Sequence, residues 1–254
     1  ARLWLEAPLK SIPTSILGLD EFSVKKGRVY DTAIADLKGR QVIGVVSGHR
    51  QKEVEDFFDS LPQPEKVQVV VMDMHEPFRQ AVEMCLPQAK VVADKFHVLM
   101  HVHQALDQVR AGLQPAKGRR GELFHARYLL LRASERLTPQ GYARLMEVLR
   151  QYPILARAWR LKEAFRAWYG CSSRSEAEAR LAQWEDAVRE DGPMPFKGLL
   201  PMLRIWRNEI LNYFDYRYTN GFLEGKNNRI KVIKRVAYGY RNGAMYYWNA
   251  GIGT

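Results

Sequence analysis

The first hundred residues alternate between short apolar runs and polar breaks, which is typical of a mixed α/β region. The runs at 14–23, 28–37 and 41–48 are separated by tight polar connections and predict three antiparallel strands. Two later runs, at 66–73 and 89–94, are continuously apolar, as expected of strands buried on both faces. The pattern therefore predicts five short strands in this part of the chain.

Two segments between these runs have helical spacing. Residues 54–61 repeat apolar side chains at helical intervals before Pro62, and residues 77–87 form a second helical segment that ends at Pro87. The predicted order is β-β-β-α-β-α-β, and a further helix follows from about Lys95. This order predicts an α/β fold with a mixed sheet.

Residues 98–215 have a different character. Leucine, alanine and arginine dominate, and strand-like runs disappear. Thr138 is the expected N-cap of one helix, with Pro139 at its first position. Residues 173–190 and 196–214 are expected to form further helices. The sequence thus predicts an all-helical block between the α/β region and the C-terminal segment.

Composition narrows the choice of partner. The 254 residues are 46% hydrophobic and carry a formal net charge of +11, which favours nucleic acid over an anionic membrane as the partner. No apolar run approaches the length of a bilayer span, and no signal peptide is recognisable. Cys85 and Cys171 form neither a CxxC pair nor a disulfide framework, so we expect a reduced, cytoplasmic chain.

The C-terminal segment concentrates positive charge around one acid, Glu224. On a helix that starts near Asn220, Phe222 and Ile230 share an apolar side, and Glu224 lies on the cationic side. The residue four positions later is Asn228, so a helical ion pair does not explain Glu224. We expect Glu224 to bind a metal and the cations to contact DNA phosphates. These cations are Lys226, Arg229, Lys231, Lys234, Arg235 and Arg241.

Two aspartates end predicted strands, Asp20 and Asp73. A carboxylate at a strand end lies at the rim of a sheet, where ligands approach, although aspartate is equally common there as a turn former or helix cap. Mg²⁺ prefers oxygen ligands, and two such ions held by shared acids catalyse displacement at phosphorus. Asp20, Asp73 and Glu224 are therefore the candidates for a metal centre.

Three blocks of sequence carry a family resemblance. "GLDEF" (18–22), residues 69–98 and residues 220–242 resemble the DDE transposases of bacterial insertion sequences, most closely the ISL-three family. The resemblance implies an RNase H-like core that is interrupted by a large all-α insertion. The implied parts are residues 1–97 (first part of the core), 98–215 (insertion) and 216–254 (second part of the core, with the final acid and a basic helix).

The resemblance also assigns roles. It makes Asp20, Asp73 and Glu224 the first, second and third catalytic acids, which bind two Mg²⁺ ions, with Mn²⁺ as a substitute. "DKFH" (94–97) resembles a D-x-x-H signature, which makes Asp94 and His97 supporting residues of the site. Asp94 also ends a strand and is the alternative second acid.

The implied function is metal-dependent cleavage at transposon ends, followed by strand transfer into target DNA. The implied partner is double-stranded DNA, bound by a homodimer or larger assembly at the bacterial nucleoid. The alternatives are an RNase H-like nuclease or junction resolvase that cuts without joining, and a non-catalytic DNA-binding derivative. The N-terminal DNA-binding region of such enzymes is missing from these residues, so we expect the catalytic part of a longer protein.

Overall fold

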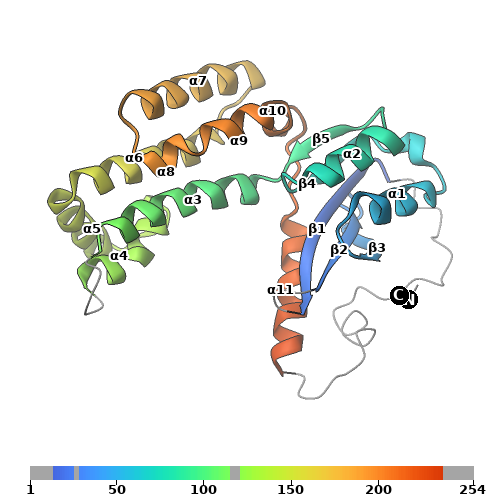
Figure 1. The fold of residues 1–254 in the computed structure, drawn as a ribbon, viewed down its shortest axis with the longest axis horizontal. Helices are drawn as coiled ribbons and strands as arrows, with labels where there is room; N and C mark the ends of the chain where they lie inside the picture. Colours follow the sequence, from blue (N-terminus) through green and yellow to red (C-terminus); the bar gives the residue numbers. More distant parts are fainter. Residues whose placement is uncertain (1–13, 26–28, 115–120, 237–254) are drawn as a thin grey trace. The chain divides into compact units, whose positions relative to one another are not determined.

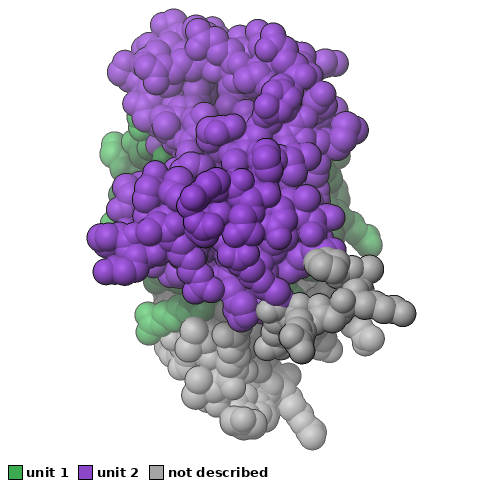
Figure 2. Space-filling model, turned by 90° about the vertical axis from the view of Figure 1, so that its left-hand side faces the viewer, with its two compact units in different colours: residues 1–96, 216–254 green, residues 97–215 purple. Residues whose placement is uncertain are grey.

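The computed structural model describes residues 14–25, 29–114 and 121–236, with the backbone alone for residues 24, 25, 29 and 230–236. The chain divides into two compact units (Figure 2). The first contains residues 1–96 and 216–254, and the second contains residues 97–215.

The first unit is built on a five-stranded mixed sheet with the strand order β3-β2-β1-β4-β5 (Figure 1). β1 pairs antiparallel with β2 and parallel with β4, while β5 lies parallel to β4. The predicted α/β class is confirmed. The strands are β1 (Ile16–Lys25), β2 (Val29–Asp36), β3 (Gln41–Ser47), β4 (Val69–Met72) and β5 (Lys90–Ala93).

Helices cover both faces of this sheet. α1 (Gln51–Asp59) and α2 (Glu76–Cys85) lie on one face, and α11 (Gly221–Val236) lies on the other (Figure 1). Burial on both sides explains why β4 reads as a continuous apolar run, since all four of its residues are buried. On the α11 face, Leu223 packs in the core with residues of the first three strands, which are Phe22, Ala33, Ala35 and Val42.

The parallel strands bring three aspartates to one edge of the sheet. Gly18 pairs with Val71, and Asp20 lies two residues further along β1. The prediction that Asp20 ends its strand was wrong, because β1 continues to Lys25 in its pairing with β2. Asp73 directly follows β4, and Asp94 directly follows β5. Because parallel strands run in one direction, their carboxyl ends meet at the same edge, which is where ligands bind in open α/β sheets.

A glycine on β1 allows the chain before α11 to approach the sheet closely. A Cβ atom at Gly18 would lie 2.5 Å from Asn220 Oδ1 and 2.7 Å from Leu37 Cδ2. We expect Gly18→Ala to destabilise the protein by about 1–3 kcal/mol through overpacking. Gly225→Ala is the matched control, because a Cβ atom on this α11 residue meets nothing within 4 Å. Equal urea-unfolding free energies for the two variants would contradict the prediction.

The second unit is helical. Thr138 Oγ1 accepts a hydrogen bond from Gly141 N at 3.1 Å, which confirms the predicted N-cap. Among the described helices of the whole chain, none is long and apolar enough to cross a bilayer. The helices that lie in or enter this unit are α3 (Lys95–Gly112), α4 (Glu122–Leu131), α5 (Pro139–Gln151), α6 (Pro153–Trp168), α7 (Arg174–Asp191), α8 (Met194–Lys197), α9 (Leu200–Ile205) and α10 (Arg207–Tyr216), with short 3₁₀ turns at Ser134–Arg136 here and at Pro64–Lys66 in the first unit.

The prediction of one long helix was wrong. The segment 196–214 is divided among α8, α9 and α10 instead of forming a single helix. Pro201 lies in the first turn of α9, where its missing N–H is tolerated but would interrupt a continuous helix. Trp206 then leaves helical geometry, with φ −102° and ψ 17°, between α9 and α10.

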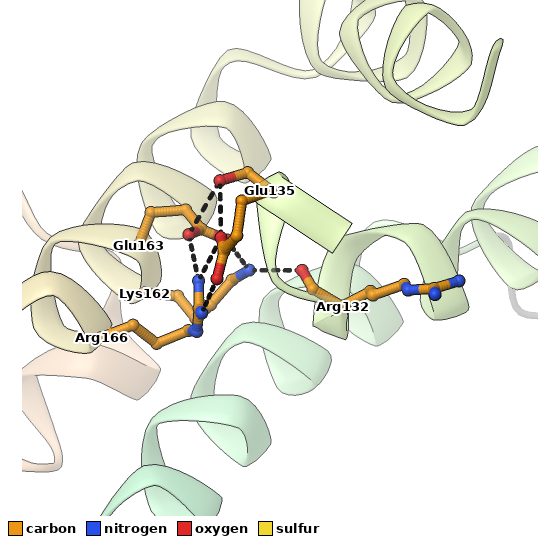
Figure 3. Close-up of polar contacts among 6 residues, drawn as sticks. Arg132, Glu135, Lys162, Glu163 and Arg166 are labelled. Atoms are coloured by element: carbon orange, nitrogen blue, oxygen red, sulfur yellow. Dashed lines mark hydrogen bonds and ion pairs between the residues drawn. The ribbon is translucent and has the colours of Figure 1, made fainter. Parts of the chain in front are cut away.

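A charged network in this unit extends from the buried Lys162 to the exposed Glu135 (Figure 3). Lys162 is fully buried, pairs with the Glu163 carboxylate and donates to the Arg132 carbonyl at 3.1 Å. Burial lowers the pKa of Lys162, against the opposing effect of Glu163. Arg166 bridges Glu163 and Glu135, each at 2.6 Å, and its hydrogen bond lowers the pKa of Glu135 to about 2.

Candidate functional site

Asp20 lies on β1 beneath α11. Asp20 is only 6% exposed, and it follows the fully buried Leu19. Asp20 Oδ2 accepts a hydrogen bond from Asn227 Nδ2 of α11 at 2.6 Å. A buried carboxylate requires compensation by hydrogen bonds or a cation, and Asn227 supplies one such hydrogen bond.

Asp20, Asp73 and His97 form one group of ligand atoms. Each residue offers one atom, and these atoms all lie within 4.8 Å of one another. Asp73 is half-buried and opens the turn before α2, where its carbonyl accepts from His75 N at 2.7 Å. His97 lies in the first turn of α3, three residues after Asp94.

The donor set of this group suits a hard divalent cation. Two carboxylates this close repel each other when both are ionised, and a cation between them relieves that repulsion. Carboxylate oxygens are the preferred protein ligands of Mg²⁺ and Mn²⁺. The residues present therefore fit a metal centre at the Asp20–Asp73 pair.

Asp94 has a different geometry from the other two aspartates. It is 2% exposed, and its Oδ1 accepts a hydrogen bond from the backbone N–H of Asn220 at 2.9 Å. Asn220 directly precedes α11, so the carboxylate lies at the positive end of that helix, where an anion is stabilising. Asp94 holds the start of the helix that carries Glu224.

Glu224 lies in the first turn of α11 and is half-buried. It is not part of the group formed by Asp20, Asp73 and His97. Leu223, which precedes it, is fully buried, and Asn227, which follows it by less than one turn, contacts Asp20. Glu224 therefore lies beside the stripe of α11 that faces β1.

That stripe extends beyond the apolar side expected from the sequence. Phe222 packs against the core as expected, but the buried positions at the start of the helix are Asn220, Leu223 and Asn227. Periodicity of apolar residues does not detect asparagines that face a sheet. The available signal was their seven-residue spacing, which places both on one helical face with Leu223.

The predicted DNA-binding cations lie on α11 and beyond it. Lys226 is half-buried with its Nζ 5.5 Å from the Phe222 ring centroid, and Arg229 is exposed. The described part of the structure does not include the side chains of Lys231, Lys234 and Arg235 or any part of Arg241.

Comparison with known proteins defines the class of this chain as a transposase. A family model described as "Transposase" matches residues 17–249, which is most of the chain. The chain belongs to the ISL3 (ISL-three) family of DDE transposases.

Two curated relatives carry names that agree with this family. The transposase for insertion sequence element IS1001 of Bordetella parapertussis is 29% identical over 238 residues, which cover 91% of this chain and 59% of the relative. The transposase for insertion sequence element IS1557 of Mycobacterium tuberculosis is 26% identical over 253 residues, which cover 89% of this chain and 57% of the relative. The chain thus spans less than two thirds of the length of these relatives.

Proposed function

We propose that this chain is the catalytic part of an insertion-sequence transposase, which cuts DNA at the ends of its element and joins the freed 3′ ends to target DNA. The observation that carries the proposal is the convergence of Asp20 and Asp73, from neighbouring parallel strands, to within 4.8 Å. The family supports DNA transposition as the process.

The core is proposed to be RNase H-like. Three antiparallel strands precede two parallel ones, and β1 lies in the middle of the sheet order. The helical unit, residues 97–215, comes between β5 and α11, and therefore before Glu224. Both features support a two-part core with a helical insertion.

Asp20, Asp73 and Glu224 are proposed to hold two Mg²⁺ ions, with Mn²⁺ as a substitute. Such ions, when bound, activate the attacking hydroxyl and stabilise the leaving oxygen at phosphorus. Asp20 lies within β1 and Asp73 directly follows β4, so the sheet holds both residues. Glu224 is proposed to join them from the first turn of α11, because Asn227 of the same helix contacts Asp20. Asp73 is preferred to Asp94 as the second acid, because Asp73 joins the ligand group and Asp94 accepts a bond from Asn220.

The supporting residues are assigned by their contacts. Asp94 is proposed to fix the start of α11, and His97 to stand beside the acid pair. The DNA backbone is proposed to lie along α11 and the residues after it, because cations there neutralise phosphates. These cations are Lys226, Arg229, Lys231, Lys234, Arg235 and Arg241.

Joining two element ends is proposed to require at least two chains.

A strand-transfer assay tests the proposed activity. The chain is incubated with Mg²⁺, a supercoiled plasmid and a labelled duplex whose pre-cut 3′ end comes from the terminus of the element that encodes it. We expect labelled DNA to be joined to the plasmid, with Mn²⁺ able to replace Mg²⁺ and EDTA abolishing the product. The measurement is the labelled plasmid resolved on an agarose gel.

The other possible products would contradict the proposal in distinct ways. Metal-dependent cutting without joined product would favour a nuclease or junction resolvase. DNA binding that is unaffected by EDTA, with neither cutting nor joining in Mg²⁺ or Mn²⁺, would favour a non-catalytic DNA-binding protein.

A further inference from the structure

Buried hydrogen bonds form a polar seam between α11 and the sheet, at β1 and at Asp94 after β5. Asn220 Nδ2 donates to the Leu19 carbonyl at 2.6 Å, while Asn220 N donates to Asp94 Oδ1 at 2.9 Å. Two helical turns later, Asn227 Nδ2 donates to Asp20 Oδ2, also at 2.6 Å. These bonds connect residues that are 126 to 207 positions apart in the sequence.

Packing stability alone does not account for this seam. Asn227 is 2% exposed, and among the described residues its Oδ1 has no hydrogen-bond partner. Asn220 is 1% exposed, and its Oδ1 atom also has no hydrogen-bond partner among the described residues. An unsatisfied buried acceptor costs about 1–3 kcal/mol, whereas a leucine at either position would extend the apolar stripe begun by Leu223.

The chemistry of the pair determines which way the amide of Asn227 faces. An ionised carboxylate only accepts hydrogen bonds, so the Nδ2 group must face Asp20 and the amide oxygen must face away. The orientation that leaves Asn227 Oδ1 unsatisfied is therefore the one that holds Asp20. The bond restricts rotation of the Asp20 carboxylate beside Asp73.

We propose that Asn227 is a positioning residue of the acidic centre, which orients Asp20 toward a divalent cation and holds the helix that carries Glu224 at a set distance from β1. This inference rests on the proposed function. One hydrogen bond performs both tasks, because its donor is on α11 and its acceptor is on β1. Asn227 acts through Asp20 and is given no contact with DNA or metal.

Binding of Mn²⁺ alone tests the inference without relying on catalysis. Free Mn²⁺ is measured by its electron paramagnetic resonance signal as it is titrated with the full chain. Wild-type protein is expected to bind Mn²⁺ and Asp73→Asn to lose that binding. Asn227→Leu preserves side-chain volume but removes the donor, and we expect it to weaken Mn²⁺ binding by about 10-fold or more, as for other residues that orient metal ligands.

A neighbouring asparagine supplies the matched control. Asn228 is exposed on the same helix, and Asn228→Leu is expected to bind Mn²⁺ like wild type. DNA affinity in EDTA, measured by fluorescence anisotropy, should be unchanged in both variants, because positioning of Asp20 does not alter the cationic surface. Asn227→Ser replaces Asn227→Leu if the leucine variant does not fold, and the same loss of Mn²⁺ affinity is expected.

Failure of the proposed metal centre and failure of the positioning role of Asn227 give different results in this experiment. A wild-type chain that binds no Mn²⁺, or whose binding survives Asp73→Asn, overturns the proposed metal centre itself. Intact wild-type binding together with unchanged affinity in folded Asn227 variants overturns only the positioning role. Equal weakening by Asn228→Leu also overturns it, because the effect would then belong to α11 as a whole.

Discussion

Asp73→Asn is expected to lower DNA cleavage and joining by on the order of 10³-fold, whereas Asp94→Asn should retain most of the activity. Asp73 lies in the ligand group with Asp20, so loss of its charge removes a ligand and part of the negative charge that attracts a divalent cation. Asp94 serves the N–H of Asn220, and an asparagine keeps an oxygen that accepts this bond. The measurement is the rate of strand transfer in Mg²⁺.

The two variants control for each other, because both replace a carboxylate with an amide of the same shape at the end of a parallel strand. Melting temperatures and DNA affinity in EDTA show whether each protein is folded and binds DNA. If folded Asp94→Asn is inactive while Asp73→Asn is active, Asp94 is the second acid and the assignment of Asp73 is wrong.

Glu163→Ala is expected to destabilise the helical unit by about 3 kcal/mol, because it leaves the ammonium group of Lys162 buried without its carboxylate. Lys162→Met should change the unfolding free energy by no more than about 1 kcal/mol. Methionine fills a similar space without charge, and Glu163 keeps its 2.6 Å ion pair with Arg166. Urea unfolding, followed by circular dichroism, measures both changes.

An exposed ion pair in the same unit provides the control for Glu163→Ala. Glu147 and Arg150 form an i,i+3 pair with side chains that are 52% and 74% exposed. Glu147→Ala should therefore cost only about 0.5 kcal/mol. Equal costs for Glu147→Ala and Glu163→Ala would show that burial of Lys162 does not govern the energetics of the network.

Local sequence pattern was sufficient for elements whose structure depends on near neighbours. The continuous apolar runs ending at Asp73 and Asp94 are strands buried on both faces, and Thr138 caps its helix as predicted. The predicted helix at 196–214 failed because Pro201 and Trp206 interrupt it, although its composition is helical throughout. Composition measures propensity, whereas continuity of a helix depends on single backbone positions.

The sequence by itself determined the α/β class, the aspartates that follow β4 and β5, and the concentration of cations around Glu224, because periodicity, turn chemistry and charge are local properties. Only the tertiary structure decided that Asp20 meets Asp73 and His97, that Asp94 holds the start of α11, and that Asn220 and Asn227 face β1. These contacts join distant segments, and they form because burial of both sheet faces brings α11 onto β1. The spacing of Asn220 and Asn227 places them on one helical face, but it does not identify their partners, since the role of a buried asparagine is defined by the group it meets after folding.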